Sequence, residues 1–250
     1  MATISDDIDA RRPPAWMLAR EGAALAARFY RAFGSVAPRG PADATPLMVV
    51  PGFLATDRTT LGLQRALAGA GWRVAGWGMG LNAGARADTL ERLAGRIARL
   101  GGGRKVVLVG WSLGGVFARE VAKLRPDLVA AVVTLGSPFS GDPRANNAWR
   151  LYELVARHPV DNPPIRTVLR DKPPVPTLAL WSRRDGIVAV ASARGAAGEC
   201  DVERELACTH MGFAVSAAAY PHIVEALQAF IPPRNGEGDH AKHGGGGPES

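Results

Sequence analysis

The feature that most constrains the fold is a regular alternation of short apolar runs with helical patterns between residues 46 and 231. Short apolar runs rich in Val, Leu and Ala are typical of strands that are buried on both faces. Such runs lie at 46–51, 72–76, 105–110, 129–135 and 176–181, and helical patterns lie at 58–70, 87–100, 113–124 and 214–231. This alternation predicts an α/β fold with a mostly parallel central sheet and helices on both faces.

The 250-residue chain has room for one large domain of this kind. We expect it at residues 45–231, after an N-terminal amphipathic helix and linker at 1–44. The long connection at 136–175 contains a helical pattern, ANNAWRLYELVARH, and is predicted to be a short cap-like insert. The polar, glycine-rich stretch at 232–250 is predicted to be a disordered tail.

Residues 15–33 carry an apolar stripe at helical spacing, with arginines beside it. The stripe consists of Leu18, Gly22, Leu25, Phe29 and Phe33. One interpretation is a helix that lies on the domain. The other is a basic amphipathic helix that rests on a membrane surface or covers the entrance of a site.

Composition excludes several function classes. The net charge is +7, but the 30 basic residues are mostly arginines spread along the chain, so nucleic-acid binding is not expected. No apolar run reaches the ~18 residues of a membrane span, and the start lacks a secretory signal, so we expect a cytoplasmic protein.

Cys200 and Cys208 flank a strand-like segment that would hold them roughly 26 Å apart, which predicts free thiols.

Ser112 lies in a G-x-S-x-G motif, Gly110-Trp111-Ser112-Leu113-Gly114. The motif alone is a weak signal, but here an apolar strand pattern ends at Gly110 and a helix pattern begins just after Ser112. A strand, a tight turn and a helix in this order form the nucleophile elbow, in which glycines allow the close packing that the turn requires. The pattern therefore predicts that the turn presents Ser112 as a nucleophile.

With these motifs, residues 46–231 resemble the α/β-hydrolase superfamily, specifically small bacterial members of its serine esterase and lipase branch. The resemblance implies a catalytic triad in the order Ser, Asp or Glu, His, with a minimal cap. It implies that Asp185, directly after the strand pattern 176–181 and before Gly186, is the acid. Asp142 and Asp201 remain alternatives for this role.

His210 is the histidine that the resemblance assigns as the general base. It lies in ACTHMGF, between the strand-like DVEREL and the closing helical pattern. His158 lies in the insert, His222 lies within the closing helical pattern, and His240 and His243 lie in the tail. An imidazole at position 210 can accept the Ser112 proton while Asp185 fixes its tautomer.

The same fold supplies two backbone N–H donors for an oxyanion hole. One follows the nucleophile, here Leu113, and the other lies in the loop after the first strand, where Gly52-Phe53 occupies the place of the family's His-Gly-X motif. We expect Phe53 to be this donor, with Leu54 as the alternative. Pro51 stands where many relatives have histidine, so the support of this loop must differ.

The expected activity is ester hydrolysis through an acyl-enzyme, without metal or cofactor. Four residues are predicted to contact an apolar acyl group: Leu54, Trp111, Phe139 and Trp149. Phe139 and Trp149, in the insert, could equally be plain packing. The expected partner is a small ester or lipid. An acyltransferase, thioesterase or amidase would use the same triad, and a non-catalytic protein that binds a membrane or ligand is the alternative from another class.

Overall fold

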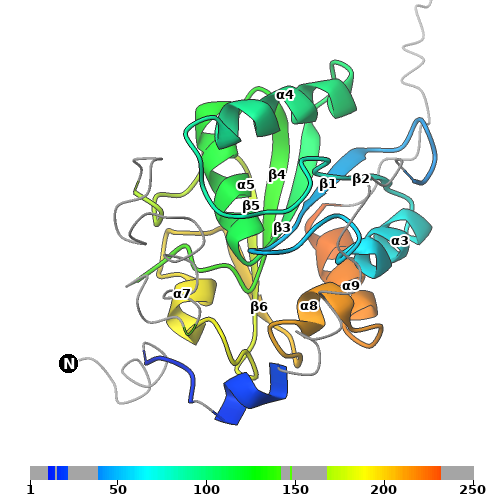
Figure 1. The fold of residues 1–250 in the computed structure, drawn as a ribbon. Helices are drawn as coiled ribbons and strands as arrows, with labels where there is room; N and C mark the ends of the chain where they lie inside the picture. The colour runs from blue at the N-terminus through cyan, green and yellow to red at the C-terminus, as the bar shows by residue number, and fades with distance from the viewer. Residues whose placement is uncertain (1–10, 15, 22–38, 142–146, 148–167, 232–250) are drawn as a thin grey trace, which may run out of the picture.

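The chain is described by a computed structural model that covers residues 11–14, 16–21, 39–141, 147 and 168–231 (Figure 1). In this part of the chain, six parallel strands form one sheet in the order β2-β1-β3-β4-β5-β6. They are β1 (Pro46–Val50), β2 (Arg73–Gly76), β3 (Val106–Trp111), β4 (Val129–Leu135), β5 (Thr177–Trp181) and β6 (Val202–Glu205). The predicted fold class is confirmed.

Helices cover both faces of this sheet. Their bounds are α3 (Leu61–Gly69), α4 (Thr89–Gly101), α5 (Leu113–Leu124), α7 (Val190–Arg194), α8 (Gly212–Val215) and α9 (Tyr220–Phe230). The prediction of a single helix over 214–231 is wrong, because α8 ends at Val215 and a new helix begins at Tyr220. Pro221 stands in the first turn of α9, where its missing N–H and fixed φ favour a helix start.

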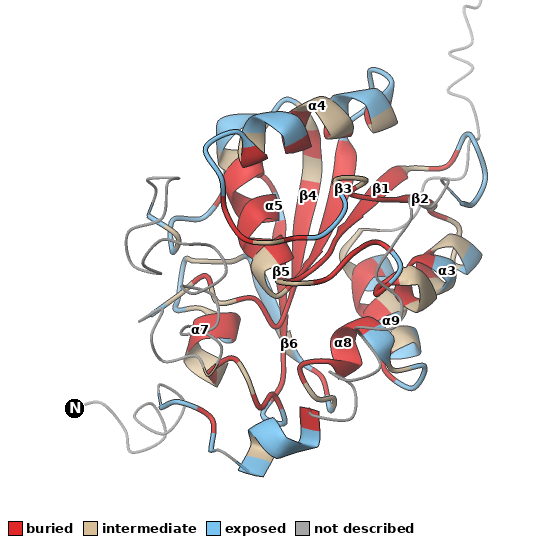
Figure 2. Ribbon diagram, viewed as in Figure 1, coloured by how far each residue is buried: buried red, intermediate tan, exposed pale blue. Residues whose placement is uncertain are grey.

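Side chains of each central strand alternate between two hydrophobic cores. Leu47 and Val107 point toward the core under α3, α8 and α9, whereas Met48 and Leu108 point toward the core under α4 and α5. Figure 2 shows the result as a continuous buried region through the centre of the sheet. Burial on both faces explains why these strands appear in the sequence as unbroken apolar runs.

The sheet has a topological switch point between β1 and β3. After β1 the chain adds β2 on one side, and from β3 onward every strand is added on the other side. In α/β folds, ligands bind at such a switch point, beyond the carboxyl ends of the strands. The loop after β1 and Ser112 both lie at this point.

A helix over residues 16–21 lies beside the loops that follow β5 and β6, as the dark blue segment in Figure 1. Leu18 of the predicted stripe is 37% exposed and Trp16 is 62% exposed, while Glu21 is fully buried. The helix therefore contacts the domain through a polar residue rather than through Leu18. The other residues of the stripe lie outside the described residues.

Several expectations concern residues that the structure does not describe. They include the helix pattern at 145–158, the tail at 232–250 and most of residues 1–44. Cys200 and Cys208 are free thiols, as predicted. Within the described ranges, none of the helices has the length and hydropathy needed to cross a membrane.

Candidate functional site

Ser112 is the only residue between the end of β3 and the start of α5. Its backbone has φ 54° and ψ −127°, and Leu54 is the other non-glycine residue with positive φ in the described part of the chain. Residues other than glycine rarely adopt this backbone conformation, because it costs about 1–3 kcal/mol. It persists only where the surrounding packing enforces it. The strained turn predicted by the motif is therefore present at Ser112.

Three glycines make the turn possible by removing side chains at points of close approach. A Cβ atom at Gly110 would overlap the backbone of Gly115, and one at Gly114 would overlap the carbonyl oxygen of Val50. A Cβ atom at Gly115 would overlap the Ser137 hydroxyl. The first turn of α5 is thus packed directly against the end of β1 and the end of its own strand.

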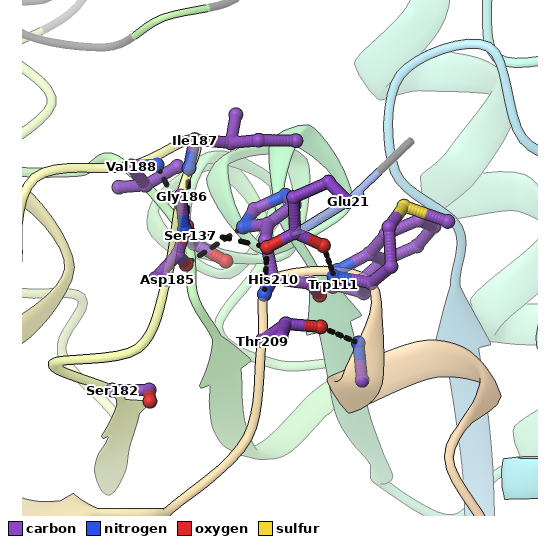
Figure 3. A network of polar contacts seen from close by, with 12 residues as sticks. Glu21, Trp111, Ser137, Ser182, Asp185, Gly186, Ile187, Val188, Thr209 and His210 are labelled. Atoms are coloured by element: carbon purple, nitrogen blue, oxygen red, sulfur yellow. Dashed lines mark hydrogen bonds and ion pairs between the residues drawn. The ribbon is translucent and has the colours of Figure 1, made fainter. Parts of the chain in front are cut away.

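Asp185 and His210 form a buried pair. The Asp185 Oδ2 atom lies 2.7 Å from His210 Nδ1 (Figure 3), and both side chains are almost fully buried. The second carboxylate oxygen, Oδ1, accepts hydrogen bonds from the backbone N–H groups of Ile187 and Val188, each at 2.8 Å. These bonds fix the carboxylate, which in turn fixes the rotation of the imidazole ring.

Trp111 connects the elbow to the loop that carries His210. Its indole Nε1–H donates to the His210 carbonyl oxygen at 3.0 Å, and its ring lies 5.7 Å from the imidazole ring, centre to centre. Ser182 connects the two loops in a similar way, since its hydroxyl donates to the Cys208 carbonyl oxygen and accepts from the Arg184 N–H. The structure thus pairs Asp185 with His210 and links Ser112 to them through the adjacent Trp111.

The loop after β1 is held by Asn82, a buried residue that the sequence reasoning missed. The Asn82 side chain donates from Nδ2 to the Pro51 carbonyl oxygen at 2.8 Å, and its backbone carbonyl accepts from the Leu54 N–H at 2.7 Å. This arrangement supplies the different support that Pro51 led us to expect. Nothing in the local pattern GLNAG distinguishes Asn82 from an ordinary turn residue.

Gly52 places the same loop against the elbow. A Cβ atom at Gly52 would lie 3.0 Å from the Ser112 Cβ atom and 3.0 Å from the Trp111 ring. Leu113 begins α5, where the first backbone N–H groups of a helix have no partner within the helix. The N–H of Leu54 donates to the Asn82 carbonyl oxygen, which counts against the alternative that Leu54 is the second oxyanion donor.

The other predicted residues have varied surroundings. Phe139 is 1% exposed and lies under the Arg119 guanidinium, 4.0 Å from ring centre to Cζ, which favours the packing role over substrate contact. Trp111 is buried, and Leu54 is half-buried. Asp201 binds Lys172 and Thr177, away from His210. Trp149 and Asp142 lie outside the described residues.

Cys208 is a second potential nucleophile two residues before His210. Burial raises the pKa of its thiol to about 12, with further contributions from the negative charges of Asp185 and Glu21. A thiol with such a pKa is almost entirely protonated at neutral pH and is a poor nucleophile. Among the residues that the structure describes, no three His, Cys, Asp or Glu side chains are grouped to hold a metal ion.

The packing at Gly114 generates a stability prediction. Gly114→Ala should lower the free energy of unfolding by about 3 kcal/mol, because the new methyl group would displace backbone at the end of β1. The measurement is urea unfolding followed by circular dichroism. Gly69→Ala is the control, since a Cβ there has no neighbour within 4 Å and should stabilise α3 by about 0.5 kcal/mol. Equal stability of the two variants would contradict the packing described for the elbow.

The suppressed thiol generates a reactivity prediction. Near pH 8, iodoacetamide should leave Cys208 unmodified in the native protein over a period that fully alkylates it in urea, since only about 10⁻⁴ of the thiol is ionised. Mass spectrometry of peptides that contain each cysteine measures this. Rapid native alkylation of Cys208 would show that the thiol is accessible and ionised.

Comparisons with known proteins agree with this architecture. The family described as the alpha/beta hydrolase fold matches residues 45–164. Among solved structures, a metagenome-derived lipolytic enzyme from the study of LipS and LipT has a TM-score of 0.56 at 18% identity, covering 78% of this chain and 96% of that one. A lipase-esterase related protein from Clostridium acetobutylicum has a TM-score of 0.56 at 16% identity, with 78% and 98% covered.

A monoacylglycerol lipase from Paleococcus ferrophilus has a TM-score of 0.54 at 18% identity, covering 79% of this chain and 100% of that one. At such low identity these similarities establish the fold and leave the substrate open. The parallel sheet, the strand order and the family match agree with one another. The chain has the α/β-hydrolase fold.

Proposed function

We propose that this protein is a serine hydrolase that cleaves carboxylic esters through Ser112, His210 and Asp185. The observation that carries the proposal is the buried 2.7 Å contact between His210 Nδ1 and Asp185 Oδ2, beside a strained serine at the strand-to-helix elbow. A structural histidine has no need of a buried carboxylate held by two backbone N–H groups. An acid and base that must keep one orientation during catalysis do need it.

In the proposed reaction the Asp185 carboxylate accepts the Nδ1–H of His210, which leaves Nε2 as a proton acceptor. Nε2 takes the hydroxyl proton of Ser112 as Oγ attacks the ester carbonyl. The imidazolium then gives this proton to the leaving alcohol, and an acyl-enzyme remains. Water repeats the sequence, losing a proton to His210, and releases the carboxylic acid and Ser112.

The backbone N–H groups of Phe53 and Leu113 are proposed to bind the oxyanion of the tetrahedral intermediate. Leu113 lies at the N-terminus of α5, a 12-residue helix whose dipole favours negative charge there. Asn82 holds the loop that carries Phe53 by bonds on both sides of that residue, at Pro51 and Leu54. Donors fixed in this way need no rearrangement when charge develops.

The proposed substrate is an ester with an apolar acyl group. Solved structures with the same fold include proteins described as lipolytic enzymes and a monoacylglycerol lipase, which supports this class. Leu54 remains a proposed contact because it is half-buried beside the oxyanion loop. We leave Phe139 out, since the guanidinium of Arg119 already covers its ring.

A panel of nitrophenyl esters of increasing acyl length tests the proposed function. Ser112→Ala should lower kcat/KM by about 10³-fold or more for every ester that the wild type cleaves, because the nucleophile is gone. Asp185→Asn should lower kcat by about 10³- to 10⁴-fold, because the histidine loses its correct tautomer. Stopped-assay release of nitrophenol provides the rates.

The matched control for the acid is Asp127→Asn, which makes the same chemical change in the exposed turn before β4. It should keep wild-type rates. Activity near wild type in Ser112→Ala would refute the proposed mechanism. Full activity in Asp185→Asn alone would transfer the acid role to Asp142.

We also propose that the helix over 16–21 contacts anionic lipid surfaces. Trp16 is 62% exposed and Leu18 is 37% exposed, and the neighbouring Arg20 is exposed. Exposed tryptophan beside basic residues suits the boundary between lipid headgroups and acyl chains. The net charge of +7 would add attraction to a negatively charged surface.

Flotation with vesicles of phosphatidylglycerol and phosphatidylcholine tests this contact. The double substitution Trp16→Ser and Leu18→Ser should reduce the bound fraction at least about threefold at low salt, because both apolar side chains leave the interface. Leu124→Ser is the matched control, since Leu124 is 57% exposed on another part of the surface. If wild-type protein does not float, or if the double variant floats equally well, the lipid contact is refuted.

A further inference from the structure

Glu21 is a buried carboxylate that belongs neither to the sheet domain nor to the proposed triad. It ends the described helix over 16–21 and is 0% exposed. Burying a carboxylate is costly unless several donors surround it. The identity of those donors therefore indicates what the residue does.

Three backbone N–H groups donate to Glu21, and all belong to the two loops that carry Asp185 and His210. Oε1 accepts from His210 N at 2.8 Å and from Gly186 N at 3.3 Å. Oε2 accepts from Met211 N at 3.0 Å. Gly186 directly follows Asp185, and Met211 directly follows His210, so one carboxylate bridges the loops of the acid and the base (Figure 3).

Neighbouring contacts fix the helix in the position that this bridge requires. A Cβ atom at Gly186 would overlap the Met17 carbonyl oxygen, so the acid loop and the helix backbone meet without a side chain between them. The Asn147 amide donates to the Pro13 carbonyl oxygen at 3.0 Å and to the Gly186 carbonyl oxygen at 2.8 Å. The segment before Glu21 thus meets the loop that carries Asp185 at two points, directly at Met17 and through Asn147 at Pro13.

The Glu21 bridge holds the backbone position of residue 210, which Asp185 does not hold. Asp185 fixes the rotation of the imidazole ring, but the position of the ring also depends on the backbone of residue 210. That backbone is held on its N–H by Glu21 and on its carbonyl by Trp111. A displacement of about 1 Å between catalytic groups can cost on the order of 10²-fold in rate.

From these contacts we propose that Glu21 is a positioning residue for the catalytic base and acid. It acts through the backbone of the two loops and does not touch the substrate. The inference rests on the proposed function, in which His210 moves the proton of Ser112. Through Glu21, the N-terminal helix would also help to position the proposed catalytic residues.

Kinetics of Glu21→Gln and Glu21→Ala test the proposal. Glutamine keeps the shape but places an amide NH₂ against one of the three N–H donors, whereas alanine leaves all three without an acceptor. We expect kcat to fall about 10-fold in Glu21→Gln and about 100-fold in Glu21→Ala, with KM within about threefold of wild type. The rate at which a fluorophosphonate modifies Ser112 should fall in parallel.

Two controls separate positioning from general stability. Glu91→Gln makes the same change on the exposed side of α4 and should keep the wild-type kcat. Ile97→Ala removes a fully buried side chain from the core under α4, which destabilises the fold at a distance from both loops. It should lower the melting temperature but keep kcat when assayed below that temperature. Wild-type kcat in both Glu21 variants, or a loss no larger than in Ile97→Ala, would overturn the proposal.

A second readout does not depend on ester cleavage. The proton shared between His210 Nδ1 and Asp185 can be followed by its low-field NMR signal. This signal should shift or broaden in Glu21→Ala and stay unchanged in Glu91→Gln. If no ester is cleaved by the wild type, the proposed function fails, and an unchanged signal in Glu21→Ala would independently refute the positioning role.

Discussion

The site depends on the close approach of two backbones, where the first turn of α5 meets the end of β1. Gly114 lies against the Val50 carbonyl so tightly that any side chain would separate them. The residues after Val50 form the loop proposed to supply one oxyanion donor, and Leu113, the residue before Gly114, is proposed to supply the other. This close backbone contact therefore holds the strained turn at Ser112 beside the loop that follows β1.

The parts of this arrangement that depend on local signals could be predicted from the sequence. Strands buried on both faces appear as apolar runs, and their predicted positions lie within one residue of β1 to β5 at each end. The elbow was predictable because the glycines that permit its close packing lie within a few residues of Ser112 in the sequence. Asp185 and His210 were found by their places after successive strands, and the structure pairs them at 2.7 Å. The break between α8 and α9 was missed, because Ala-rich residues 214–219 suit a helix as well as a turn.

Contacts that join distant segments could not be predicted in this way. Glu21 accepts a hydrogen bond from a residue 189 positions later, and Asn82 binds a carbonyl 31 positions earlier. Their partners are backbone N–H and carbonyl groups, which every residue type offers, so no side-chain pattern marks the partner positions. The same reason explains the orientation of the N-terminal helix. The apolar stripe suggested that Leu18 faces the domain, but three donors around Glu21 turn the polar side inward.

The histidine loop shows why these distant contacts matter for the proposed chemistry. Residues 206–211 lie in irregular structure, which by itself leaves a base free to shift. Three different segments hold His210 instead: the acid loop binds its ring, the end of β3 binds its carbonyl, and the N-terminal helix binds its N–H. The proposed base is therefore held by the assembled fold and not by its own loop alone. The sheet domain begins near residue 45, but the hydrogen bonds that hold the proposed base begin at Glu21, so the N-terminal helix is attached to the domain at the loop that carries His210.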